Sequence, residues 1–272
     1  MSPRTVHRSP AIVLRSRDYG ESDRIVTFLT LDYGKLTGIA KGAKKSRRRF
    51  VNTLDAFCLS ELHFSQHRPE GLAFLELCDM VQYFGAIRSN LEKTVMASHL
   101  VELVDAFAPE RKKNEPLFNL LQDFLGLLND GSEAGGLVRF FEIRLLKIMG
   151  YDPVLDRCIV CGQPILSAGG YRFHPLAGGL KCAACAPGET GYCLCSPGTA
   201  RTLLLAKELP PERLRRIVLT RQGALESERL LGRFITHLLG KELKSLRVLA
   251  QLQRTSSSSA PGNGAVASPG RT

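Results

Sequence analysis

The sequence RIVTFLTLDYGKLTGIAKGAKKSRRRF, residues 24–50, decides the fold of the N-terminal part of the chain. It begins with two runs rich in β-branched and apolar residues, RIVTFLTL and KLTGIAKG, separated by a turn that contains Gly34. Similar short runs, AIVLRSR, FCLSELHF and LAFLELCDMVQYF, lie on either side within residues 10–84. Runs broken by glycine, proline and charged turns are typical of β-strands, and about five at this spacing favour a small closed β-barrel.

The second half of the same stretch is strongly basic. It holds six Lys and Arg residues, and the run KKSRRR, residues 44–49, falls between the third and fourth expected strands, so we expect this run on a loop. The chain carries 37 Lys and Arg against 26 Asp and Glu, a formal charge of +11, and residues 1–60 hold twelve of the former against five of the latter. This charge favours polyanions: nucleic acids, acidic membrane surfaces or acidic protein tails. The six residues are Lys41, Lys44, Lys45, Arg47, Arg48 and Arg49.

A basic run of this kind has two interpretations. It is often only a solvated, flexible loop. On a small barrel it can instead line a groove that holds phosphates while aromatic rings stack on the bases of single-stranded nucleic acid. The nearby rings are Phe50, Tyr19 and Tyr33, although aromatic residues of small barrels more often lie in the core. Such binding would depend on salt and discriminate weakly among sequences.

From about residue 90 the apolar period changes from two to 3.6, which predicts three helices up to residue 150. Gly131 and Gly150 are placed to end the second and third of them. Residues 151–198 interrupt this pattern, and helical periodicity resumes at Ser196 and Pro197, a predicted N-cap and first-turn proline. The fold class is therefore α+β. The expected domains are a barrel over 1–84, a helical domain over 85–155 and 199–253, an inserted module over 156–198, and a disordered tail over 254–272.

The inserted module carries the strongest local motif, two C-x-x-C pairs separated by twenty residues. Two such pairs let four thiolates converge on one Zn²⁺ at about 2.3 Å, and Gly162 helps the first pair to turn. Four protein ligands leave no open coordination position, so we expect one structural zinc ion per chain. The predicted ligands are Cys158, Cys161, Cys182 and Cys185.

The remaining cysteines leave alternatives open. Cys193 and Cys195 form a C-x-C pair that would supply a ligand in place of Cys185, and His174 also lies within reach in the sequence. The alternative to any metal is a group of reduced thiols in a loop-rich region. Cys58 and Cys78 lie within strand-like runs, where small buried thiols are the default.

Several functional classes find no support in the sequence. The N-terminus lacks the apolar segment of a secretory signal, and no run of 18 apolar residues occurs, so we expect a cytoplasmic protein without a membrane segment. Neither G-x-x-x-x-G-K-[ST] nor G-x-S-x-G is present. His63 and His67 have the spacing of a metalloprotease pair without its Glu, and His99 and His237 are expected to be structural. We therefore expect a protein that is not an enzyme.

The order of these features resembles the bacterial RecO family of recombination mediators. The resemblance runs over most of residues 8–250 and rests on YGESDRIVTFLTLDYGKLTGIAKGAKK, SRRRFVNTLDAF, RFFEIRLLKIMGYDP, the module that opens at CIVCG, and LLGKELKSLRVL. It implies an N-terminal OB barrel, a helical domain and, as in many members, a zinc module. It also implies a protein that binds single- and double-stranded DNA, anneals complementary strands, and acts with RecR to help RecA replace the single-stranded-DNA-binding protein SSB.

The resemblance also implies roles for individual residues. The family docks the acidic, hydrophobic C-terminal peptide of SSB near the helix that matches VRFFEIRLLKIMGY, where Arg139 would meet a carboxylate. An ordinary exposed arginine is the alternative. Lys241 and Lys244 of GKELKSL would add a secondary DNA contact. The implied DNA-contacting residues are Lys35, Lys41, Lys44, Lys45, Arg47, Arg48 and Arg49.

Two rival functions come from other classes. One is a zinc-ribbon transcription or translation factor that binds structured RNA. The other is an enzyme whose catalytic groups are too widely spaced for a motif search. Strand annealing on SSB-covered DNA separates the first from a recombination mediator, and turnover of DNA ends or nucleotides separates the second. The resemblance implies no role for the Ser-, Pro- and Gly-rich tail.

Overall fold

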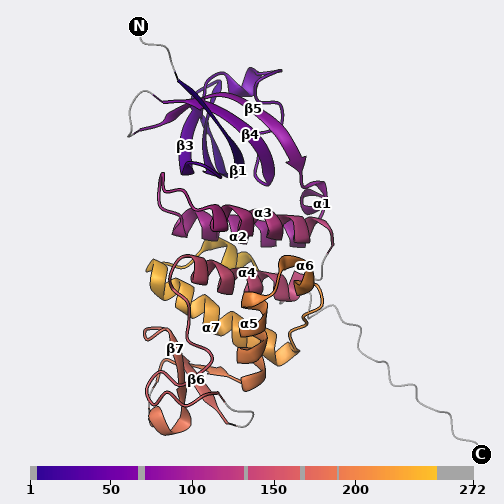
Figure 1. Ribbon diagram of the computed structural model, residues 1–272. Coiled ribbons are helices and arrows are strands. Elements are labelled where there is room, and N and C mark those ends of the chain that lie inside the picture. Colours follow the sequence, from indigo (N-terminus) through magenta and orange to yellow (C-terminus); the bar gives the residue numbers. More distant parts are fainter. Residues whose placement is uncertain (1–4, 67–70, 132–133, 166–168, 189, 250–272) are drawn as a thin grey trace, which may run out of the picture.

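The computed structural model describes residues 5–66, 71–131, 134–165, 169–188 and 190–249. Three parts are stacked along one axis: the N-terminal sheet, a layered group of helices, and a small second sheet (Figure 1). The fold is therefore mixed α+β, as the change of apolar period predicts. The tail expected over residues 254–272 lies outside the described residues.

The N-terminal sheet closes on itself. β1 pairs antiparallel with both β2 and β4, and a short parallel pairing of β3 with β5 completes the order β1-β2-β3-β5-β4. The number of strands and their runs agree with the sequence pattern. The strands are β1 (Val6–Tyr19), β2 (Asp23–Thr30), β3 (Gly34–Ala40), β4 (Cys58–Ser65) and β5 (Ala73–Tyr83).

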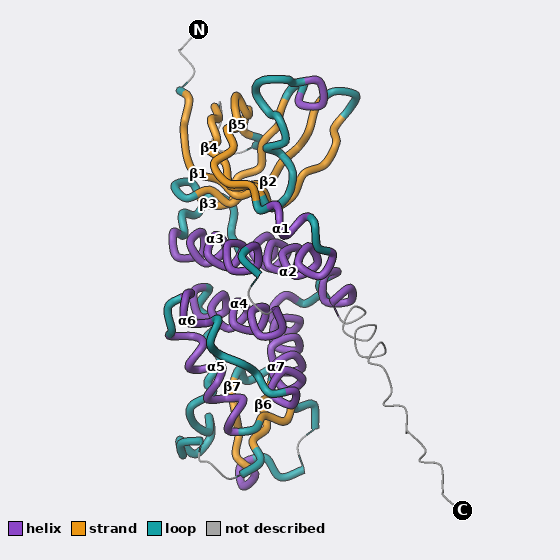
Figure 2. The backbone as a smooth tube through the Cα atoms, turned by 90° about the vertical axis from the view of Figure 1, so that its right-hand side faces the viewer, coloured by secondary structure: helices purple, strands orange, loops and turns teal. Residues whose placement is uncertain are grey.

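The first strand is apolar on both faces because each face meets a different core. Ala11 and Val13 lie in the core enclosed by the closed sheet, together with residues such as Phe28. Ile12 and Leu14 belong instead to the core formed with the helices. Successive side chains of a strand point to opposite faces, so one strand serves both cores. The sheet is thereby fixed to the helical part (Figure 2).

The helices begin and end where the sequence places capping residues. The side chain of Ser196 accepts a hydrogen bond from the Thr199 backbone N–H, with Pro197 in the first turn, and Gly131 and Gly150 follow their helices with positive φ. The helices are α1 (Gly85–Arg88), α2 (Leu91–Phe107), α3 (Glu115–Asn129), α4 (Ala134–Ile148), α5 (Pro197–Glu208), α6 (Pro211–Leu214) and α7 (Arg221–Leu239). None of those in the described ranges has the length and apolar character needed to span a bilayer.

The second sheet lies at the far end of the helices. Its strands are β6 (Tyr171–His174), β7 (Gly179–Cys182) and β8 (Cys193–Cys195), in the order β7-β6-β8. Phe173 of β6 packs edge-on against Phe234 of α7 with ring centroids 5.6 Å apart. This apolar contact joins the cysteine-containing module to the helices.

Candidate nucleic-acid interface and metal centre

The basic run leaves β3 and lies on a loop that the protein holds in place. The loop begins with the 3-10 helix η1 (Ala43–Lys45), and its backbone is tied to the turn between β1 and β2 by the hydrogen bond from Lys44 N to Ser22 O, 3.0 Å. The six basic side chains then fall into two groups. Three of them anchor the loop, and three are exposed and have no partner among the described residues.

Lys41 is the first anchor. Its Nζ lies 2.8 Å from Asp23 Oδ2, while Asp23 Oδ1 accepts the backbone N–H of Gly42 at 2.8 Å. Gly42 adopts φ 66°, a conformation that suits glycine at this turn. The hydrogen bond from Gly42, followed by that from Lys41, lowers the pKa of Asp23 to about 2. The carboxylate is therefore charged at neutral pH and holds Lys41 against the sheet.

Lys44 and Arg49 complete the anchoring. Lys44 Nζ lies 2.9 Å from Asp18 Oδ2 and donates to the Gly20 carbonyl at 3.1 Å, and the hydrogen bond with Lys44 lowers the pKa of Asp18. Arg49 Nη2 donates to the carbonyl of Lys41 at 2.7 Å, which closes the loop on itself. Sequence reasoning missed these acidic partners. The signal was present, because Asp18 and Asp23 flank the turn that precedes β2.

The other three basic side chains are free. Lys45, Arg47 and Arg48 are exposed and make no hydrogen bond or ion pair with any residue that the structure describes. They lie within four consecutive positions, so their charges act on one region of solvent. An anchored loop that presents three unpaired cations can exchange their water and counterions for phosphates without first breaking internal ion pairs.

The three aromatic residues noted in the sequence lie in different environments. Phe50 is 5% exposed within the core of the closed sheet, where Arg49 lies 5.0 Å from its ring centroid. Tyr33 is half-buried and packs edge-on against Phe64, 5.1 Å between centroids. Tyr19 is exposed at the end of β1. Of the three, Tyr19 alone presents its ring to solvent.

Lys35 lies apart from the basic loop, which corrects its expected place in the DNA-contacting set. Its side chain is 12% exposed, donates to the Asp105 carbonyl at 2.8 Å, and lies 3.7 Å from the Asp105 carboxylate and 3.6 Å from Glu110. Asp105 belongs to α2, so Lys35 joins the sheet to the helices. An amine that is paired and largely buried in this way is not available to a phosphate.

Arg139 is also buried inside the protein and paired with an acidic residue. It is 4% exposed and donates from Nη1 to both oxygens of Glu142 at 2.8 Å. His99 Nε2 lies 2.8 Å from Glu142 Oε1, and His99 Nδ1 lies 2.8 Å from Ser245 Oγ. Burial favours the neutral acid, but Arg139 and His99 outweigh it and lower the pKa of Glu142. The expectation that Arg139 receives a peptide carboxylate is therefore wrong, because Glu142 already occupies its guanidinium.

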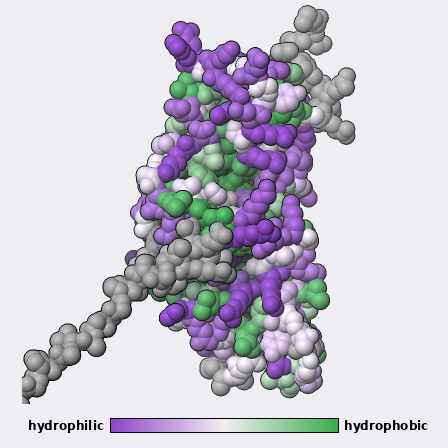
Figure 3. Space-filling model, turned by 180° about the vertical axis from the view of Figure 1, so that it is seen from behind, coloured by the Kyte–Doolittle hydropathy of each residue, from purple (hydrophilic) through white to green (hydrophobic). Residues whose placement is uncertain are grey.

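Lys241 and Lys244 lie at the junction of the sheet and the helices. They line a cleft of about 450 Å³ together with Arg15 and the apolar side chain of Phe57. Both lysines are exposed. Figure 3 shows apolar and hydrophilic surface mixed over the face of the molecule that is turned away in Figure 1. The cleft shares no lining residue with the pocket of about 230 Å³ that adjoins the basic loop.

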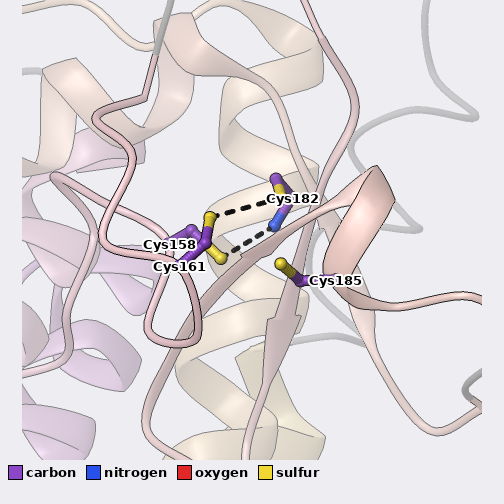
Figure 4. Close-up of side chains that lie close together, drawn as sticks. All are labelled: Cys158, Cys161, Cys182 and Cys185. Atoms are coloured by element: carbon purple, nitrogen blue, oxygen red, sulfur yellow. Dashed lines mark hydrogen bonds between the residues drawn. The ribbon is translucent and has the colours of Figure 1, made fainter.

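The four cysteines of the C-x-x-C pairs come together in one cluster (Figure 4). Their sulfur atoms all lie within 4.8 Å of one another, and the sulfurs of Cys161 and Cys182 are 3.9 Å apart. A tetrahedron with metal–sulfur bonds of about 2.3 Å has sulfur–sulfur edges of about 3.8 Å. The cluster, Cys158, Cys161, Cys182 and Cys185, therefore has the dimensions of a four-thiolate metal site.

Backbone amides prepare this cluster for negative charge. The N–H of Cys182 points to the sulfur of Cys158 at 3.4 Å, and Gly162, with φ 72°, donates to the Cys158 carbonyl at 2.9 Å to close the first knuckle. Burial opposes ionisation of Cys158, but the backbone N–H groups of Cys161 and Cys182 outweigh it and lower its pKa to about 6. A hydrogen bond with the Cys182 sulfur raises the pKa of Cys185 to about 12.

The alternative ligands lie outside this cluster. Cys193 and Cys195 are buried in β8, and their thiols donate to the carbonyls of Arg229 and Ser196, each at 3.6 Å. The residues that the structure brings within ligand distance of one another do not include His174. Cys58 and Cys78 are buried in the closed sheet, as their strand-like setting predicts. Burial raises the pKa of the Cys78 thiol to about 11.

A closed sheet with exposed cations on one loop is an arrangement that many nucleic-acid-binding proteins share. The chain matches the family model "Recombination protein O N terminal" over residues 1–84 and "Recombination protein O C terminal" over residues 88–247. The two matches meet at α1, where the sheet ends and the helices begin.

Curated relatives give the same result. A protein named DNA repair protein RecO from Syntrophus aciditrophicus (strain SB) is 46% identical over 256 residues, which cover 93% of this chain and 99% of the relative. Proteins of the same name from Geobacter metallireducens and Bacillus pumilus are 37% and 33% identical, each over 90% of this chain and over 98% and 94% of the relative. The chain belongs to the RecO family of DNA repair proteins.

Proposed function

We propose that this chain is a recombination mediator that binds single- and double-stranded DNA through the free cations of its β3–β4 loop. In this proposal the closed sheet is an OB-type barrel, the class of small barrel that holds single strands in basic grooves. The observation that carries it is the unpaired, exposed state of Lys45, Arg47 and Arg48 on a loop fixed by other ion pairs. The proposed place of action is the cytoplasm.

The proposed activity is annealing of complementary strands and, with RecR, assistance to RecA in replacing SSB. Two single strands repel each other through their phosphates. Cations that neutralise some of these charges release counterions and let the strands approach and pair. In this mechanism the protein neither forms nor breaks a covalent bond, and the proposal therefore includes no enzymatic step.

For the cysteine cluster we propose one structural Zn²⁺. The four thiolates, their spacing and the amides that point at Cys158 fit this ion. With all four positions taken by protein, the ion would cross-link the loop before β6 to the end of β7. It would stabilise the module without binding substrate.

For the C-terminal peptide of SSB we propose a site at the same helix as Arg139, in a cavity that other residues of α4 line. A cavity of about 160 Å³ is lined by Leu137 and Phe140 of α4 and by Val218, with Arg215 at its wall. Arg215 is exposed and pairs with Asp130 at 2.8 Å. A peptide carboxylate can replace Asp130 at this guanidinium while apolar side chains enter the cavity. Arg215→Ala should weaken binding of a synthetic SSB tail peptide, measured by fluorescence anisotropy, and unchanged affinity would exclude the site.

Annealing of SSB-covered strands tests the main proposal. Complementary labelled oligonucleotides are coated with SSB, and duplex formation is followed by energy transfer with and without the protein. We expect pairing to accelerate, with DNA ends intact and no nucleotide consumed. A rate equal to that of SSB-coated DNA alone would reject the mediator function and favour a binding protein for another nucleic acid, such as structured RNA.

A further inference from the structure

Tyr83, the last residue of β5, has an unusual setting for an aromatic side chain. It is 49% exposed, and with Tyr19 it is one of two strongly exposed aromatic residues in the described part of the closed sheet. Aromatic side chains gain most by burial, so a half-exposed ring at the end of a strand calls for a reason.

Arg88 and Gly85 define the surroundings of this ring. The Arg88 guanidinium carbon lies 5.1 Å from the ring centroid. A Cβ added to Gly85 would lie only 3.2 Å from Tyr83 Cε1, so the absence of a side chain at Gly85 makes room for the ring. The ring therefore contacts Arg88 while about half of the residue stays exposed.

Arg88 is itself fixed by the segment that follows the basic run. Its Nη2 donates to the Ala56 carbonyl at 2.7 Å, and its Nη1 lies 3.5 Å from Asp55 Oδ2. Asp55 in turn pairs with Arg24 of β2 at 3.1 Å. The support behind Tyr83 is thus a network of ion pairs and hydrogen bonds, which costs little further ordering when a ligand binds.

The Tyr83 ring and the basic loop both lie along β5. The backbone N–H of Cys78 donates to the Arg49 carbonyl at 3.0 Å, so the end of the basic run lies beside the middle of β5. Tyr83 is five residues further along the same strand, which is about 17 Å at about 3.4 Å per residue. OB folds bind roughly 4–16 nucleotides of single-stranded nucleic acid, so one DNA strand can contact both the Tyr83 ring and the free cations of the loop.

We propose that Tyr83 is a stacking platform for one base of a single strand whose phosphates contact the free cations of the loop. This inference rests on the proposed DNA binding. It adds a physical reason for the protein to bind single-stranded DNA more tightly than duplex DNA. Every base offers a flat face, so stacking on a tyrosine ring tolerates any sequence. In a duplex the base faces are already stacked on their neighbours and are not offered to the ring.

Affinity measurements with two kinds of DNA test the platform. Tyr83→Ala should bind an oligo-dT strand about 5- to 150-fold more weakly, the range expected for the loss of one base–aromatic stack, and Tyr83→Phe should bind as wild type. Duplex affinity and the salt slope should not change, because no cation is removed. Tyr151→Ala is the matched control: this tyrosine is 46% exposed in the helical part. Thermal melting confirms that each variant is folded.

A fluorescence measurement reports the stack directly. The chain contains no tryptophan, so Tyr83→Trp introduces a single tryptophan at the platform and Tyr151→Trp places one at the control position, each of which is excited selectively over the remaining tyrosines. Oligo-dT should quench the first and leave the second unchanged. Equal oligo-dT affinity of wild type and Tyr83→Ala, or unchanged emission of Tyr83→Trp at saturation, overturns the platform while leaving DNA binding intact. Absence of oligo-dT binding by the wild type overturns both proposals.

Discussion

Removal of the three free cations should change how DNA affinity depends on salt. The variant Lys45→Ala/Arg47→Ala/Arg48→Ala removes side chains that are exposed and unpaired within the described residues. It leaves the anchoring ion pairs of Lys41 and Lys44 in place. The loop should therefore keep its position, and the fold should keep its stability, because no internal contact of these side chains is lost.

The size of the effect follows from the number of phosphates released. Each phosphate neutralised on a single strand contributes about 0.7 to the slope of log affinity against log salt, so three contacts contribute about 2.1. Between about 50 and 200 mM salt, the wild type should lose about 18-fold more affinity than the variant, since a fourfold change raised to the power 2.1 is about 18. At high salt the two affinities should converge.

The assay is fluorescence anisotropy of a labelled oligonucleotide at four or five salt concentrations. A variant with the same loss of net charge on the helical part, Arg213→Ala/Arg216→Ala/Arg221→Ala, serves as control; these side chains are likewise exposed and unpaired among the described residues. If both variants flatten the slope equally, overall charge and not the loop governs binding. A loop variant with the wild-type slope would contradict the assignment outright.

Three further predictions concern stability. Cys158→Ser should release the proposed zinc and lower the melting temperature, and metal analysis that finds equal zinc in variant and wild type would contradict it. Glu142→Gln should cost about 3–5 kcal/mol of unfolding free energy by leaving the buried Arg139 unpaired, as measured by urea denaturation; a loss below 1 kcal/mol would contradict the burial argument. Because the folded pKa of Glu142 lies below its ordinary 4.5, its charge stabilises the fold above that pH, and the contribution is lost as pH falls through the folded value. Wild type should therefore lose more stability on acidification than Glu142→Gln.

The cysteine cluster shows how much a local pattern can predict. The spacing C-x-x-C places the two thiols of each pair on one turn of the chain. A four-thiolate site then requires only that the two turns meet in the folded protein. The choice between Cys185 and the C-x-C pair required the structure. Cys193 and Cys195 lie on β8, and their thiols donate to backbone carbonyls outside the cluster.

The sequence by itself determined the strand and helix periods, the basic run, the capping residues and the family resemblance, because each depends on neighbours a few residues apart. The tertiary structure decided which charges are free. Lys41 and Lys44 meet carboxylates 18 and 26 residues earlier in the chain, and Lys35 meets Asp105 of α2. Arg139 and Glu142 lie one turn apart on α4, and the packing of the other helices around α4 decides that this pair is buried. A charge is available to DNA only when no closer partner satisfies it, and its partners are set by packing between segments that the linear sequence does not place side by side.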